Sequence, residues 1–190
     1  YKRQLLTTAQ GVSPRLPLFH NFDMARYYYG ATFVSGTGEG YLESRNAMGY
    51  AVVISMLWKL TGWSLLSPLM LNALAALLTV VFSGVLTRRL LAGAVARSGE
   101  WLMTAGMVAA GSVCYLTFSG TLLMKESLTA LSLVVAALSV LMLRRGRAAA
   151  WAGALLFVGS CAVIGILRHH WVVIPVVGLL VAACLLYTSD

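Results

Sequence analysis

The sequence predicts an all-α protein, a polytopic bundle of transmembrane helices with an extracytoplasmic loop that bears interfacial helices. Hydrophobic residues make up 59% of the 190 residues and charged residues only 11%. The mean hydropathy of +0.83 lies far above that of soluble globular domains. Several apolar stretches approach the length of about 20 residues that a helix needs to cross the hydrocarbon core. We divide the chain into a first loop (1–68), a bundle of about five spans (69–183) and a tail (184–190).

The net charge is +8, and the placement of the basic residues indicates how the chain crosses a membrane. A nucleic-acid-binding protein gathers its Lys and Arg residues on one polar face. Here the Lys and Arg residues lie between apolar stretches, as they do in the loops of membrane proteins. We therefore expect membrane lipids as partners and no nucleic acid.

The first element is expected in the stretch HNFDMARYYYG, residues 20–30. Its spacing places Arg26 three residues and Tyr27 four residues after Asp23, so a helix would bring the three side chains to one face. Asp23 is also well placed to cap a helix N-terminus. The three consecutive tyrosines are typical of an aromatic belt at the headgroup level, and they could also stack on a sugar ring. The stretch alone leaves capping and catalysis both open.

A loop and a second helix follow. Residues 34–46, VSGTGEGYLESRN, are rich in Gly, Ser and Thr and predict a loop. Residues 46–66 contain an apolar run with Lys59 inside it and Trp58 and Trp63 close by. Aromatic residues beside a lysine favour a helix that lies at the membrane interface. A short transmembrane helix is the alternative, and it would invert the sidedness of everything before it.

Four stretches without an internal charge predict transmembrane helices. They cover residues 69–87, 101–124, 127–143 and 148–167, and a fifth begins at Trp171 and runs into the tail. Arginines follow the first and the third of these stretches: Arg88, Arg89, Arg97, Arg144, Arg145 and Arg147. Cytoplasmic loops collect Arg and Lys, so both junctions should face the cytoplasm. The first loop, the Lys125-Glu126 turn and the Arg168-His169-His170 turn should then face the opposite side.

The two outward turns carry candidate binding residues. Lys125 and Glu126 can simply end one helix and start the next, since an acid stabilises a helix N-terminus. A lysine at that depth equally suits an anionic headgroup, a phosphate in particular. Arg168 can hold a phosphate through two parallel hydrogen bonds, and His169 can donate or accept near neutral pH. A lone arginine can also reach the headgroups without any such role.

The two ends of the chain lead us to expect that the sequence is part of a longer protein. The chain begins with Tyr1, so a signal or a first span is expected upstream. The stretch CLLYTSD, residues 184–190, resembles the translation of an adapter used in shotgun sequencing, and we expect it not to belong to the fold. The chain is therefore expected to be a fragment of a longer protein.

These features together resemble the GT-C superfamily of polytopic glycosyltransferases. The nearest likeness is to the bacterial protein O-mannosyltransferases and the aminoarabinose transferases of lipid A, and it extends loosely over residues 21–177. It rests on Asp23 with Arg26 and Tyr27, on the stretch from Gly49-Tyr50 to Leu60-Thr61-Gly62, and on the Lys125-Glu126 turn. Two positions depart from the family pattern: Met24 stands where many members have a second acid, and Ala51 where many have a proline.

The resemblance implies a glycosyltransferase of the bacterial inner membrane whose site faces the extracytoplasmic side and whose donor is a sugar linked to a polyprenyl phosphate. Asp23 would be the catalytic base. The substrate would contact Arg26, Tyr27, Lys125, Glu126, Arg168 and His169, with Lys125 and Arg168 on the phosphate and Glu126 as an orienting partner. No cofactor is expected, and Met24 leaves a divalent metal without support. A transporter or flippase component and an envelope polysaccharide polymerase or ligase are the alternatives; a transporter would place polar residues inside its spans near mid-membrane.

Overall fold

The computed structural model describes residues 22–36, 45–62, 66–91, 99–112, 125–143 and 147–187. These residues are helical and contain no strand, which confirms the predicted all-α class for this part of the chain. In chain order the helices are α2 (Phe22–Ser35), α3 (Arg45–Thr61), α4 (Leu66–Leu91), α5 (Gly99–Gly111), α7 (Glu126–Met142), α8 (Arg147–Arg168), the 3-10 turn η2 (His169–Val172) and α9 (Val173–Tyr187).

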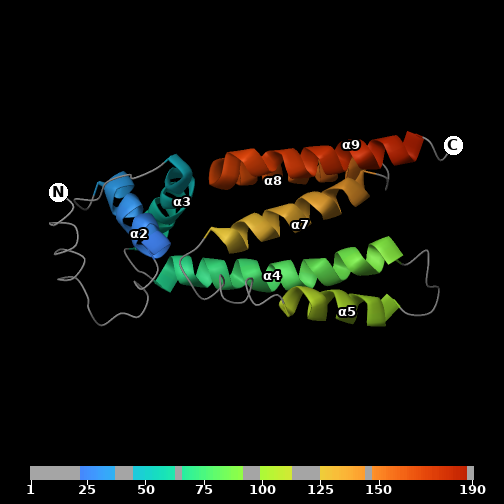
Figure 1. Ribbon diagram of the computed structural model, residues 1–190, viewed down its shortest axis with the longest axis horizontal. Coiled ribbons are helices and arrows are strands. Elements are labelled where there is room, and N and C mark those ends of the chain that lie inside the picture. Colours follow the sequence, from blue (N-terminus) through green and yellow to red (C-terminus); the bar gives the residue numbers. More distant parts are fainter. Residues whose placement is uncertain are drawn as a thin grey trace.

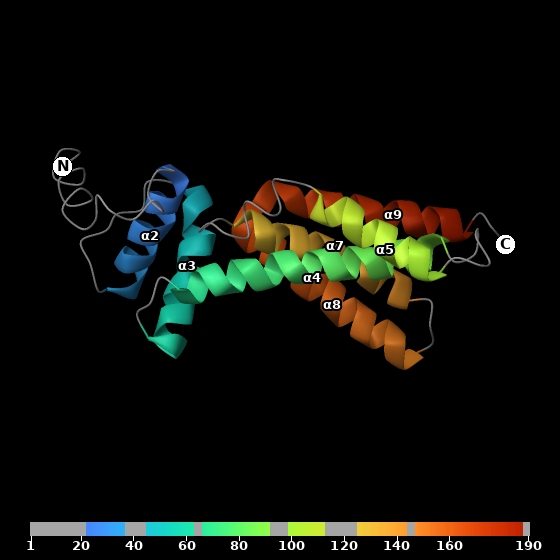
Figure 2. The same ribbon diagram turned by 90° about the horizontal axis from the view of Figure 1, so that it is seen from below.

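The longer helices lie along one axis, and α2 and α3 sit across one end of them (Figures 1 and 2). Helices α4, α7 and α9 lead away from that end, and α5 and α8 return towards it. The chain therefore alternates in direction, as short connections between neighbouring helices require. The alternation between two sides of a membrane, which the sequence predicted from its charges, is compatible with this arrangement and stays a prediction.

Two helical segments, Leu66–Leu91 and Arg147–Val181, are long and apolar enough to cross a membrane. They contain the predicted spans 69–87 and 148–167. The second segment is interrupted at Arg168, whose backbone angles (φ −152°, ψ 81°) leave the helical region. The turn η2 follows and sends α9 back along the axis (Figure 2). The structure thus has a turn where the sequence predicted one.

The other three predicted spans can be compared with the helices of the structure only in part. Helix α7 matches the predicted 127–143 and is a shorter apolar helix of 17 residues. Helix α5 ends at Gly111, and residues 113–124 of the predicted span 101–124 lie outside the described residues. Helix α9 continues to Tyr187, so the backbone is helical into the predicted tail. Passage of α5, α7 and α9 through a membrane stays a prediction.

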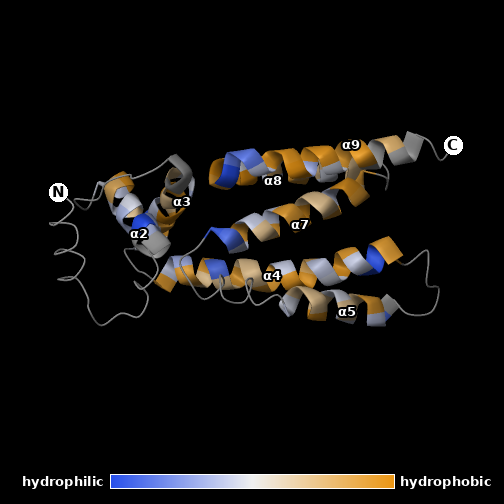
Figure 3. Cartoon of the chain, in the orientation of Figure 1, coloured by the Kyte–Doolittle hydropathy of each residue, from blue (hydrophilic) through white to orange (hydrophobic). Residues whose placement is uncertain are grey.

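Small and polar residues fill the space between the helices, and large apolar ones face outwards. The buried residues of α7 are Ser127, Thr129, Ser132, Ala136 and Ser139. Exposed residues on α4, α8 and α9 include Leu77, Leu155 and Leu180. Figure 3 shows hydrophobic residues along the helices and hydrophilic residues at several helix ends. This inverted arrangement is typical of helices that pack against one another in lipid.

Helices α2 and α3 form a pair with its own small core. The core consists of Tyr27, Ala31, Tyr50, Ala51, Ile54 and Trp58, together with Leu167 from α8. Gly36 follows α2 with φ +71° and Gly62 follows α3 with φ +83°, a backbone conformation that glycine adopts without steric cost and that commonly ends a helix. Helix α3 corresponds to the interfacial helix expected in residues 46–66, although its position at a membrane surface stays a prediction.

Candidate functional site

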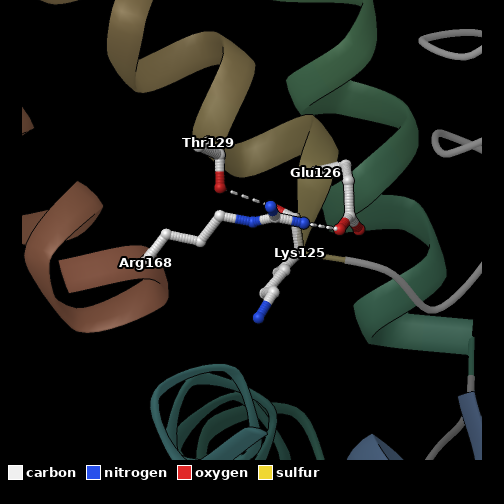
Figure 4. A network of polar contacts seen from close by, with 4 residues as sticks. All are labelled: Lys125, Glu126, Thr129 and Arg168. Atoms are coloured by element: carbon white, nitrogen blue, oxygen red, sulfur yellow. Dashed lines mark hydrogen bonds and ion pairs between the residues drawn. The ribbon is translucent and has the colours of Figure 1, made fainter. Parts of the chain in front are cut away.

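Charged residues from two distant parts of the chain meet where α7 begins and α8 ends (Figure 4). Lys125 precedes α7, Glu126 is its first residue and Arg168 is the last residue of α8. Glu126 and Arg168 are 42 residues apart in the sequence. Gly153 lets α8 approach α7, because a Cβ at this position would lie 2.8 Å from the Ser139 carbonyl oxygen. The antiparallel packing of α7 and α8 then brings the two charges together.

Glu126 and Arg168 form an ion pair that is largely shielded from solvent. Nη2 of Arg168 donates to Oε1 of Glu126 at 2.5 Å, and the two side chains are 25% and 12% exposed. Within the part of the chain that the structure describes, Oε2 of Glu126 and Nε of Arg168 are buried without a hydrogen-bond partner. The Arg168 guanidinium also lies 4.9 Å from the centre of the Trp171 ring. Glu126 is therefore the counter-charge of Arg168, for which the sequence had predicted no partner.

Lys125 points away from this pair (Figure 4). Its side chain is buried, and its Nζ lies 5.8 Å from the centre of the Tyr27 ring on α2. An ammonium over an aromatic face is attracted by the ring quadrupole, more strongly where water is excluded. The Lys125 carbonyl accepts hydrogen bonds from the backbone N–H and the hydroxyl of Thr129, at 3.0 and 2.9 Å. The first turn of α7 thus holds the Lys125 backbone in place.

Tyr27 connects this charged group to the α2–α3 pair. Its ring packs edge-on against Tyr50 of α3, with centres 5.0 Å apart and planes at 87°. Tyr50 is fully buried, and its hydroxyl donates to Oδ1 of Asn72 on α4 at 2.9 Å. Burial raises the pKa of Tyr50 well above its usual range, and this outweighs the lowering of the pKa by its hydrogen bond to Asn72. Tyr50 therefore remains a neutral donor throughout the physiological pH range.

Asp23 and Arg26 lie on the same helix as Tyr27. Because α2 begins at Phe22, Asp23 falls in its first turn, and the predicted spacing puts its position on the same face as those of Arg26 and Tyr27. The Asp23 side chain lies outside the described residues, so its predicted role as base or cap stays a prediction. Arg26 is half-buried.

The remaining predicted residue, His169, is exposed in η2 beside Arg168. Its ring packs edge-on against His170 at 5.1 Å. The structure thus gathers Tyr27, Lys125, Glu126 and Arg168 in one region and leaves His169 at its margin.

Sequence reasoning missed Asn72 as a member of this region. The available signal was an amide inside an otherwise apolar predicted span, because such a group is costly in lipid unless it is paired. Tyr50 was noticed only as part of the Gly49-Tyr50 stretch. The partners of these two residues depend on how α3 crosses α4, which the sequence pattern does not reveal.

Among the described residues, no three His, Cys, Asp or Glu side chains lie close enough together to hold a metal ion. Comparison of the chain with family models, with curated proteins and with solved structures found no match. Function is therefore inferred from the residues and their geometry.

Proposed function

We propose that the protein is a glycosyltransferase of the bacterial inner membrane that moves a sugar from a polyprenyl-phosphate donor to an envelope acceptor on the extracytoplasmic face. The resemblance to GT-C transferases suggests this activity. One observation supports it further: Lys125, beside the Glu126–Arg168 pair where α7 begins and α8 ends, lies over the ring of Tyr27 on the helix that holds Asp23. A transferase of this kind needs a base and phosphate-binding cations in one region.

The distribution of charge supports a multi-pass topology with this region outside. The exposed Arg88 and Arg89 end α4 and the exposed Arg147 begins α8. Both helix ends lie at the end of the bundle remote from α2 and α3 (Figure 1). Arginine-rich helix ends favour the cytoplasmic side. The α2–α3 end, with the candidate site, is then extracytoplasmic.

The balance of charges suits a phosphate leaving group. Lys125 and Arg168 carry two positive charges and Glu126 one negative charge, so the three residues leave one net positive charge. A fixed cation in a region of low dielectric stabilises negative charge that develops in the transition state. Glu126 would hold the Arg168 guanidinium in one orientation, and the half-buried Arg26 would face the sugar. The buried Tyr27 would support Lys125 from below its ammonium. His169, exposed beside Arg168, would contact the donor from the margin.

The proposed reaction is a displacement at the anomeric carbon of the donor sugar. Asp23 removes the proton from an acceptor hydroxyl, and the acceptor oxygen forms a bond to the anomeric carbon. The bond between that carbon and the phosphate oxygen breaks, and its electron pair leaves with the polyprenyl phosphate. A positioned general base contributes on the order of a hundred- to ten-thousand-fold to such a rate.

The test compares envelope glycans by mass spectrometry in cells that express the full-length wild type, Asp23→Asn or Glu100→Gln at equal membrane levels. Glu100 is a matched control because it is an exposed carboxylate in the first turn of α5. We expect one glycan modification to disappear in Asp23→Asn and to persist in Glu100→Gln. A modification that persists in Asp23→Asn would refute Asp23 as the base.

A further inference from the structure

Within the described residues, the α2–α3 pair joins the other helices through the apolar side chains of Leu69, Leu128 and Leu167 and through several contacts of defined geometry. Helix α2 packs on α3, where a Cβ on Gly30 would lie 3.1 Å from Cβ of Ala51. Helix α3 in turn meets α8 at Gly49, whose Cα faces the backbone of Ile166. It meets α4 through the hydrogen bond from Tyr50 to Asn72. The position of α2 relative to α7 and α8 thus depends largely on how α3 is fixed.

The hydrogen bond between Tyr50 and Asn72 is suited to fixing α3. Both side chains are fully buried, so neither group can exchange its partner for water without opening the interface. A hydrogen bond requires a defined distance and angle between its donor and acceptor. This bond therefore restricts the rotation of α3 on α4, beside the close contact of Gly49 with α8.

Tyr27 extends this constraint to α2 and α7. Its ring is in contact with Tyr50, at 5.0 Å between centres, and with the Lys125 ammonium, at 5.8 Å from its centre. Tyr27 is 5% exposed and Lys125 8% exposed, so both contacts lie in a shielded environment. The buried series Asn72, Tyr50, Tyr27 and Lys125 links α4, α3, α2 and α7.

We propose that Tyr50 and Asn72 are positioning residues, whose hydrogen bond holds the helix of Asp23 at a fixed place opposite the charges of α7 and α8. The inference rests on the proposed transferase function for its purpose, but the positioning itself is a separate physical claim. Neither residue needs to touch the substrate. Their effect on catalysis passes through the placement of α2, and a displacement of about 1 Å can cost on the order of a hundredfold in rate.

The first experiment measures that placement directly in the full-length protein. Spin labels at the exposed positions Phe33 on α2 and Leu77 on α4, in a variant whose native cysteines are replaced, report the α2–α4 distance by double electron–electron resonance. We expect a narrow distribution in the wild type and a broadened or shifted one in Tyr50→Phe and in Asn72→Leu. Tyr29→Phe serves as the control, because the half-buried Tyr29 lies on α2 with its ring against Tyr28. Unchanged distances in both variants would overturn the inference.

The second experiment separates positioning from stability with the double variant Tyr50→Phe/Asn72→Leu. Replacing both partners of a buried hydrogen bond by apolar groups costs less than removing one partner alone. We therefore expect the double variant to unfold near the wild-type temperature while its rate of glycan modification stays at least about tenfold low. Recovery of the rate together with stability would show a merely structural role and overturn the inference. If the distances change as expected but Asp23→Asn still modifies glycans, the proposed function fails and the positioning stands.

Discussion

Gly49 is the point of closest approach between α3 and α8, and replacing it by alanine should destabilise the protein. A Cβ at Gly49 would overlap the carbonyl oxygen of Ile166 and lie 2.7 Å from its carbonyl carbon and 3.0 Å from Cγ2. The overlapped atoms belong to the backbone of α8, so no side-chain rotation can relieve the contact. The two helices must move apart, and the core around the fully buried Tyr50 must open with them.

The size of the effect follows from two opposing terms. An extra methyl group in a closely packed interface costs about 1–3 kcal/mol. Alanine in place of glycine inside a helix recovers up to about 1 kcal/mol. Because the overlapped oxygen belongs to the backbone, the cost should be about 2–3 kcal/mol, and the net destabilisation of Gly49→Ala about 1–2 kcal/mol. Gly159 of α8 is the matched control, because no heavy atom lies within 4 Å of the Cβ that alanine would add, so Gly159→Ala should gain about 0.5–1 kcal/mol.

The assay is thermal unfolding of the two full-length variants in the same detergent, followed by circular dichroism. The variants should differ by about 2 kcal/mol, which corresponds to roughly 4–8 °C in Tm for about 150–250 residues and to a smaller difference for a longer chain. The Tm of Gly49→Ala should lie below that of the wild type, and the Tm of Gly159→Ala at or above it. Equal unfolding temperatures for the two variants would refute the close contact between α3 and α8.

Two further predictions concern the buried polar groups. Glu126→Gln should lower the free energy of unfolding by about 2–4 kcal/mol, because it leaves the mostly buried Arg168 without its counter-charge. The same change at the exposed Glu100 should cost less than about 0.5 kcal/mol. Equal losses in the two variants would contradict the ion pair. Burial raises the pKa of Tyr50 in the folded state, so the folded protein holds this proton when the unfolded chain has lost it. The contribution of Tyr50 to stability should therefore be constant below about pH 10 and decline as the pH rises further. Tyr50→Phe should be about 1 kcal/mol less stable than the wild type at neutral pH. Its free energy of unfolding should fall less than that of the wild type above about pH 10. Parallel curves of this free energy against pH for the variant and the wild type would argue against a buried hydroxyl.

The sequence was sufficient to predict the features that depend on the length of an apolar stretch and on the charges at its ends. The predicted span 69–87 falls within α4, and 148–167 within α8. A helix satisfies its own backbone hydrogen bonds, so a long apolar stretch that ends in charges has few other choices in lipid. The turn at Arg168 was predictable for the same reason, since charge and two histidines interrupt an apolar run.

The contacts between helices were beyond what the sequence could predict. Helices α4 and α7 bury small and polar residues at intervals of mostly three to four residues, a face that the search for apolar stretches did not consider and that does not say which neighbour it meets. The pairing of Glu126 with Arg168 depends on α7 and α8 packing side by side, and the bond from Tyr50 to Asn72 depends on the rotation of α3. Helix α5 ends at Gly111, within the predicted span 101–124, whose residues 113–124 lie outside the described part of the chain. Gly111 and Ser112 stand at this helix end, and hydropathy does not register their low helix propensity.

The polar groups inside the bundle help to choose between a transferase and a transporter. In the part of the chain that the structure describes, the buried hydroxyls of Thr79, Thr129, Ser132 and Ser139 each donate to a backbone carbonyl three or four residues earlier on the same helix. Such hydroxyls are satisfied within their own helix and do not form a polar path between helices. A transporter needs binding groups near mid-membrane, whereas the charged pair and the cation over Tyr27 lie where α7 begins and α8 ends. Among the described residues the charged pair and the buried lysine gather at one end of the bundle, as the proposed transfer at the membrane surface would require.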